Sequence, residues 1–142
     1  MTEPELAEFL EVSRTVHVAT VNADGTPHLV PLWFALDHGE IVFHTFARSR
    51  KIVNLRRDPR LTCLVEAGET YPELRGAQIS GVAELITDVS EVERHVIATM
   101  VRYDPSVAPE DAAARAPAVA AKRVAVRVGV TAVASWDHRK LA

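Results

Sequence analysis

Residues 43–60 have the sequence FHTFARSRKIVNLRRDPR, which passes from a predicted strand into a predicted helix. The strand covers residues 40–46. Ser49 is a suitable helix N-cap, because its hydroxyl can accept a hydrogen bond from a free backbone N–H of the first turn. The helix predicted over 49–57 ends before Pro59, since a proline disfavours the helical conformation in the residue that precedes it.

The first turn of this helix carries unusual charges. Helix N-termini have a partial positive charge and favour acidic side chains, yet this turn contains Arg50 and Lys51. A strand end, a short turn and a basic helix N-terminus together have the properties of a phosphate site. Asn54 lies one turn after Arg50, so the spacing places it to contact the same anion. The alternative is a solvent-exposed basic helix face, which a run of charges alone favours.

The composition is that of an ordinary globular domain. The 142 residues are 48% hydrophobic and 25% charged, with a net charge of −3. A nucleic-acid module using the basic residues at 48–60 is one alternative, but the overall acidity argues against it and we expect no nucleic-acid partner. Cys63 is the single cysteine, so the chain has no internal disulfide and no cysteine-based metal site.

The sequence also indicates where the protein works. The N-terminus is acidic, so we expect no signal peptide. No apolar run reaches membrane-spanning length, and the six histidines lack metal-ligand spacing. We therefore expect one domain over residues 1–142 that is cytoplasmic, with no membrane partner and no metal.

The hydrophobic pattern predicts a mostly β protein. The predicted strands cover residues 15–21, 26–36, 40–46, 60–67, 75–86 and 122–135, the first three forming a meander. The predicted helices cover 3–12, 49–57 and 90–102 (with Ser90 as N-cap), and a short helix lies near 110–116. Six antiparallel strands with helices at the edges favour a small barrel, which leaves no long apolar edge unpaired.

Several side chains have both a structural and a functional interpretation. Trp33, Phe34 and Phe46 are expected in the core, whereas Tyr71 lies in a loop and is expected to line a pocket. Gly81 and the nearby Gly76 either mark β-bulges or allow a flat ligand to approach the backbone.

The order of these motifs resembles that of the pyridoxamine 5'-phosphate oxidase-like split β-barrels, which bind flavins. Residues 18–28 (VATVNADGTPH) are similar to the opening hairpin of that family, and residues 31–34 and 45–59 to its cofactor-phosphate segment. Residues 75–84 look like the strand that follows. Residues 135–137 (SWD) resemble a common ending in the branch that uses the deazaflavin F420. The similarity covers nearly the whole chain.

The resemblance implies a six-stranded antiparallel split β-barrel of the α+β class with peripheral helices. It also implies a homodimer, with the cofactor in a groove between the subunits. Arg50 and Lys51, with Thr45 and Asn54, would hold the cofactor phosphate. The tricyclic ring would be flanked by residues 28–32 and 43–46, which include His28, Pro31 and His44.

Two departures from the family bear on the activity. The vitamin B6 oxidases carry a glutamine that meets FMN near the start of the fifth strand, where this chain has Gly76. We also find no C-terminal arginine-rich segment of the kind that binds their B6 substrate. Both departures argue against pyridoxamine phosphate oxidation and leave F420 and FMN open, with F420 favoured.

The resulting hypothesis is an F420-dependent oxidoreductase that passes a hydride from the reduced deazaflavin to an unsaturated small molecule. The cofactor carries the reactive centre, which explains why no acid–base pair stands out and no catalytic residue is predicted. Tyr71 and His28 are candidates for substrate contacts. The alternatives are an FMN-binding oxidoreductase and a non-catalytic F420 carrier.

Overall fold

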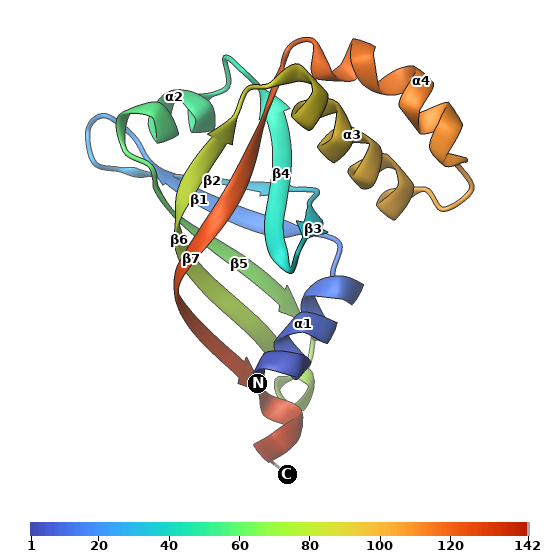
Figure 1. Ribbon diagram of the computed structural model, residues 1–142. Coiled ribbons are helices and arrows are strands. Elements are labelled where there is room, and N and C mark those ends of the chain that lie inside the picture. Colours follow the sequence, from blue (N-terminus) through green and yellow to red (C-terminus); the bar gives the residue numbers. More distant parts are fainter. Residues whose placement is uncertain (142) are drawn as a thin grey trace.

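A computed structural model describes residues 1–141 as one seven-stranded antiparallel sheet with helices around it (Figure 1). The strands are β1 (Val16–Val21), β2 (Pro27–Leu32), β3 (Ala35–Asp37), β4 (Glu40–Phe46), β5 (Arg60–Ala67), β6 (Arg75–Ile86) and β7 (Arg123–Asp137). The helices are α1 (Glu3–Val12), α2 (Arg50–Arg57), α3 (Val89–Tyr103) and α4 (Pro109–Ala120), with short 3-10 turns η1 (Tyr71–Glu73) and η2 (His138–Leu141). Within residues 1–141, every helix is too short or too polar to cross a bilayer.

The sheet curls because its two edge strands are consecutive in the chain. The strand order is β2-β1-β5-β6-β7-β4-β3, and only Trp33 and Phe34 separate β2 from β3. Two linking residues span at most about 11 Å, so the two edges must lie close together (Figure 1). This arrangement confirms the predicted mostly β, α+β class and its antiparallel barrel.

The prediction of six strands is wrong in one place. The strand expected over 26–36 breaks at Trp33 and Phe34, which gives a seventh strand. Both pairings of the expected meander are present, since β2 pairs with β1 and β3 pairs with β4, but the break places β2 and β3 at opposite edges of the sheet. The reason is that the 33–34 link carries the chain from one edge of the sheet to the other.

Two helix predictions also need correction. The N-cap of α3 is Asp88 rather than Ser90, because the Asp88 carboxylate accepts the backbone N–H of Glu91 at 3.1 Å. The short helix expected near 110–116 is the longer α4. Its buried alanines (Ala112, Ala116 and Ala120) lie on one face, and α4 packs against α3.

The strand β4 separates two hydrophobic cores. Ile41 and Phe43 point into the barrel, where they join the core that also holds Cys63. Val42 points outward and packs with Ala125 of β7 under α3 and α4. Cys63 is buried in the barrel core, as predicted, and burial raises the pKa of its thiol to about 12.

Arg102 of α3 fastens α1 to the barrel. Its guanidinium donates to the carbonyls of Leu10 and Ser13, both at 2.8 Å, and lies 4.9 Å from the centre of the Phe34 ring. The carbonyls at a helix C-terminus have no partners within the helix, so a buried arginine satisfies them well. The side chain is only 10% exposed.

We predict that Arg102→Met lowers the free energy of unfolding by about 2–3 kcal/mol, because hydrogen bonds to charged groups contribute most when buried. Urea unfolding followed by circular dichroism measures the change. Arg115→Met on the exposed face of α4 is the matched control. An equal loss in the two variants would contradict the role given to Arg102.

Candidate functional site

The candidate site begins where β4 ends and α2 starts. After Phe46, the backbone N–H of Ala47 donates to the carbonyl of Lys122 at 2.9 Å, and that of Ser49 donates to Phe46 at 3.0 Å. The turn is thereby tied to the start of β7. The turn after Phe46 is formed by neighbouring residues in the chain, and the pairing of β4 with β7 fixes its position.

Ser49 is the N-cap of α2, but it does not cap in the expected way. Its backbone is extended, with φ −64° and ψ 155°, yet its side chain makes no capping hydrogen bond. The hydroxyl oxygen is buried and finds no hydrogen-bond partner within residues 1–141. The cap residues of α1 and α3 both bond to their helices. An unpartnered buried hydroxyl costs about 1–3 kcal/mol, so this oxygen is suited to a ligand.

Four cations come close to this N-terminus in the chain or in the sheet: Arg48, Arg50 and Lys51 flank Ser49, and Arg123 pairs with Phe46 at the end of β4. In the described part of the chain none of them forms an ion pair with a carboxylate, and α2 has no acid in its first turn. Burial and, secondarily, the charge of Arg123 lower the pKa of Lys51. The groups present therefore fit a phosphate, which would compensate the cations and accept from the Ser49 hydroxyl.

Arg123 connects this site to His44. The two residues lie on the paired strands β7 and β4, and a guanidinium nitrogen of Arg123 is 3.2 Å from His44 Nδ1. Because arginine can only donate, Nδ1 accepts and the ring proton is on Nε2. The guanidinium also lies over the Phe46 ring, 4.4 Å from its centre. Burial first, then the charges of Arg123 and His95, lowers the pKa of His44 to about 4.

A cavity of about 320 Å³ opens beside this pair, between the sheet and the helices α3 and α4. Its apolar lining comes from Leu32, Trp33, Val96, Met100 and Val119. Its polar lining comes from His44, Thr99 and Arg123. The cavity is at the small end of the range for ligand pockets, and its mostly apolar walls with a few polar groups are typical of them.

Trp33 forms part of the cavity wall on the outside of the barrel. Its ring stacks on Tyr103 with centroids 4.3 Å apart and an interplanar angle of 10°. The Tyr103 hydroxyl accepts from Phe34 N–H and donates to the Arg14 carbonyl. Trp33 is nevertheless 62% exposed and Phe46 56% exposed, so the prediction that both are core residues is wrong, whereas that for Phe34 is confirmed.

The other predicted cofactor residues do not all meet at one place. Thr45 points into the barrel and is 4% exposed. His28 and Pro31 lie on opposite faces of β2, since side chains alternate along a strand. His28 is on the same face as Leu32, and its Nδ1 is buried and unpartnered within residues 1–141. The contact of these residues with a cofactor stays a prediction. Because His28 and Pro31 lie on opposite faces of β2, they cannot both contact the same face of a cofactor ring.

Asn54 has partners of its own. Its amide nitrogen donates to Thr20 Oγ1 and to Asn22 Oδ1, both at 3.0 Å, and its side chain is buried. Its amide oxygen accepts from Arg57 at 3.3 Å. The helix spacing places Asn54 near Arg50, but these hydrogen bonds attach α2 to the β1–β2 hairpin. The amide therefore holds the helix in place, and its contact with a phosphate stays a prediction.

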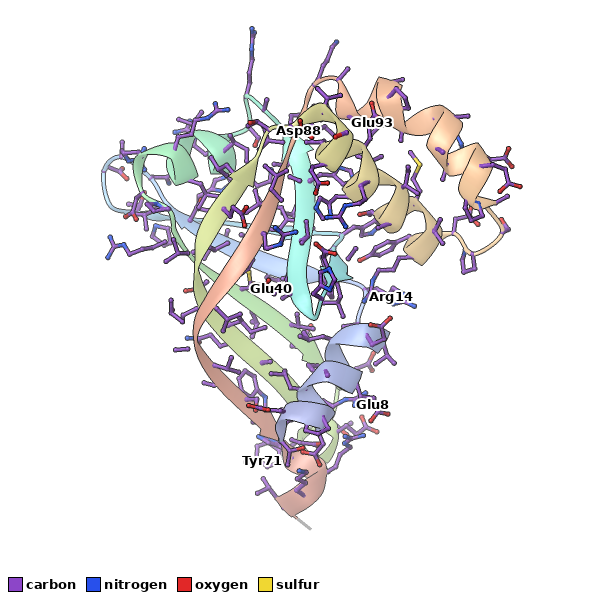
Figure 2. The ribbon with its side chains drawn as sticks, viewed as in Figure 1. Glu8, Arg14, Glu40, Tyr71, Asp88 and Glu93 are labelled. Carbon is purple, nitrogen blue, oxygen red and sulfur yellow. The ribbon has the colours of Figure 1, made fainter. Side chains whose placement is uncertain are left out.

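Tyr71 and Gly76 lie far from α2. Figure 2 shows Tyr71 at the end of the barrel where the chain termini lie. There it borders a surface depression with His138, whose ring centre is 4.6 Å away. Gly76 is covered by Trp136: a Cβ on Gly76 would be 2.4 Å from Cζ2 of that ring. Gly76 is thus a packing glycine, whereas Gly81 does adjoin a bulge.

Sequence reasoning missed Arg123 as a site residue, and it treated Ser49 only as a cap. Arg123 is recognisable on the polar face of the last strand, but its proximity to α2 depends on strand pairing across 79 residues. In the described residues no three His, Cys, Asp or Glu side chains come together as metal ligands.

We predict that His44 makes stability pH-dependent. Its folded pKa of about 4 is below the reference value of 6.5, so the unfolded chain takes up the proton first as the pH falls. The contribution of neutral His44 to the free energy of unfolding is complete above pH 6.5. It is lost between pH 6.5 and about 4, by at most about 1.4 kcal/mol per pH unit. Arg123 and His95 are the charged or titratable groups that face this ring.

His44→Gln tests this prediction, because glutamine keeps an acceptor for Arg123 and does not titrate. Melting temperatures between pH 7 and pH 5 should fall less steeply for this variant than for the wild type. His138→Gln, at the other end of the barrel, is the matched control. Parallel curves for all three proteins would contradict the prediction.

A family model described as pyridoxamine 5'-phosphate oxidase matches residues 2–137. The conserved hypothetical protein Rv2991 from Mycobacterium tuberculosis superimposes with a TM-score of 0.94 and 42% identity, over 99% of this chain and 88% of that one. No match was found among curated proteins.

Two further structures have described ligands or activities. A protein described as an F420 reductase has a TM-score of 0.70 and 28% identity, over 89% of this chain and 94% of its own. An FAD-binding protein from Mesorhizobium loti has a TM-score of 0.69 and 18% identity, over 95% of this chain and 94% of its own. This similarity indicates a shared fold. Since the family model covers nearly the whole chain, this protein belongs to the pyridoxamine 5'-phosphate oxidase family.

Proposed function

We propose that this protein is an F420-dependent oxidoreductase, which reduces an unsaturated small molecule. The observation that carries the proposal is the N-terminus of α2, where a buried unpartnered hydroxyl lies among cations that have no carboxylate partner in residues 1–141. Arg50, Lys51 and Ser49 would hold the cofactor phosphate. Bound reduced F420 would supply the hydride, while the protein orients the two reactants and excludes water.

F420 is preferred to FMN for two reasons. The F420 reductase has higher identity to this chain than the FAD-binding protein has. In addition, Trp136 covers Gly76, where the vitamin B6 oxidases carry the glutamine that meets FMN. An FMN-dependent oxidoreductase remains the alternative. A non-catalytic F420 carrier is the second alternative.

We predict that Arg50→Ala with Lys51→Ala weakens cofactor binding by about 150-fold or more, because it removes two charge-assisted hydrogen bonds that contribute roughly 1.5–3 kcal/mol each. Titration with F420 and with FMN, followed by fluorescence, measures the affinities. Arg115→Ala with Arg139→Ala removes two exposed charges elsewhere and is the matched control. Unchanged affinity in the α2 variant would refute the phosphate assignment.

Ser49→Ala, tested in the same titration, separates a role in cofactor binding from a role in helix capping. Loss of an ordinary serine cap costs about 1 kcal/mol, but this hydroxyl makes no hydrogen bond in the described protein. The variant should therefore keep or slightly increase stability, while cofactor affinity falls about fivefold. A variant that loses stability and keeps its affinity would show that Ser49 serves only the helix.

The proposed cofactor groove requires a homodimer, and the outer face of the sheet is suited to an interface. A groove of about 540 Å³ crosses β1, β5 and β6. Leu29, Val82 and Val130 are 63%, 44% and 50% exposed on β2, β6 and β7. Exposed apolar side chains of this kind favour association.

We predict that light scattering of the wild type gives twice the subunit mass. Val82→Asp should shift the mass toward that of one subunit, because it places a charge in the groove. Val89→Asp is the matched control, since Val89 is exposed at the start of α3. A monomeric wild type, or a Val82→Asp variant that stays dimeric, would count against this interface.

A further inference from the structure

The cavity between the sheet and α3/α4 is lined by Arg123, which has no carboxylate partner within residues 1–141. Arg123 is half-buried, and burial lowers the pKa of its guanidinium. Its contacts are the face of the Phe46 ring and the accepting nitrogen of His44. Both contacts orient the guanidinium, and neither neutralises it. A partly buried charge without a counter-ion is costly unless a ligand supplies one.

Arg127 provides an internal comparison. It lies four residues further along β7 on the same face, and it pairs with Asp37 and with Glu84. Asp37 also pairs with Arg94 of α3. The fold thus satisfies the second arginine of this strand with two carboxylates, whereas the arginine at the cavity has none within residues 1–141.

Arg123 lies between the proposed phosphate site and the cavity, because its charge acts on Lys51 and its side chain lines the cavity. Arg50 and Lys51 do not line it, whereas Arg123 and His44 form its polar end. The opposite wall is apolar and comes from α3 and α4 through Val96, Met100 and Val119. A ligand that fits both ends has an apolar body and one acidic group. His44 offers a second donor, because its ring proton is on Nε2.

We propose that this cavity binds the substrate and that the substrate is an apolar, conjugated carboxylate whose acidic group is held by Arg123. The substrate role depends on the proposed function, whereas the binding of an apolar anion does not. An anion at this place could belong to a substrate or to the cofactor phosphate. We assign it to the substrate because the cavity walls favour an apolar molecule.

Paired probes of equal shape test the assignment. 2-Naphthoate carries the carboxylate, and 2-naphthamide is its neutral counterpart. Their intrinsic fluorescence gives the affinities for the whole protein, with and without F420 or FMN. Arg123→Gln should weaken naphthoate binding by about tenfold or more and leave naphthamide within about twofold. Arg123→Lys should retain part of the naphthoate affinity, because it keeps the charge.

Two further variants locate the site. Val119→Trp fills the cavity and should weaken both probes, whereas Arg115→Gln on the exposed face of α4 should weaken neither. Thermal unfolding checks that each variant is folded. If Arg123→Gln does not fold, Arg123→Lys still tests the role of the guanidinium.

Three results would overturn the inference: wild-type protein that binds neither probe, equal effects of Arg123→Gln on the two probes, or loss of cofactor affinity in place of naphthoate affinity. The last result would assign Arg123 to the phosphate site. If the wild type binds neither F420 nor FMN, the proposed function fails, while the probe titrations still report on the cavity.

Discussion

The two-residue link between β2 and β3 constrains the whole molecule. A sheet of seven strands whose edges are joined by Trp33 and Phe34 cannot stay flat, because the link spans only about 11 Å. The two residues point in opposite directions. Phe34 is fully buried in the barrel, whereas Trp33 lies outside at the cavity. One link therefore closes the barrel core and supplies a wall of the candidate site.

The same curvature explains why the basic residues gather at one end of the barrel. The end of β4 leads into α2, and the start of β7 pairs with that end. Arg50 and Lys51 are the first residues of α2, and Arg123 is the first residue of β7. Arg127, on the same strand as Arg123, pairs with Asp37 and Glu84, and Arg94 of α3 also pairs with Asp37. Arg50, Lys51 and Arg123 have no such ion pair within residues 1–141.

Much of the fold can be predicted from the sequence, for reasons that are local. The strands over 60–67 and 75–86 match the structure, since apolar runs between turn residues specify them. The break at Trp33 could not be predicted, because which edge β3 joins depends on its pairing with β4. At the site, the helix start and its two cations follow from the sequence. The position of Arg123 and the hydrogen bonds of Asn54 depend on contacts with distant strands.

The placement of the two tryptophans gives the molecule a built-in optical reporter. Trp33 stacks on Tyr103 at the wall of the cavity, while Trp136 lies over Gly76 near the chain ends. A molecule that enters the cavity changes the surroundings of one indole and leaves the other as an internal reference. With Trp136 replaced by phenylalanine, the emission would come from the cavity wall alone. The fluorescence of Trp33 would therefore report whether the cavity is occupied, and that of Trp136 would report whether the protein is folded.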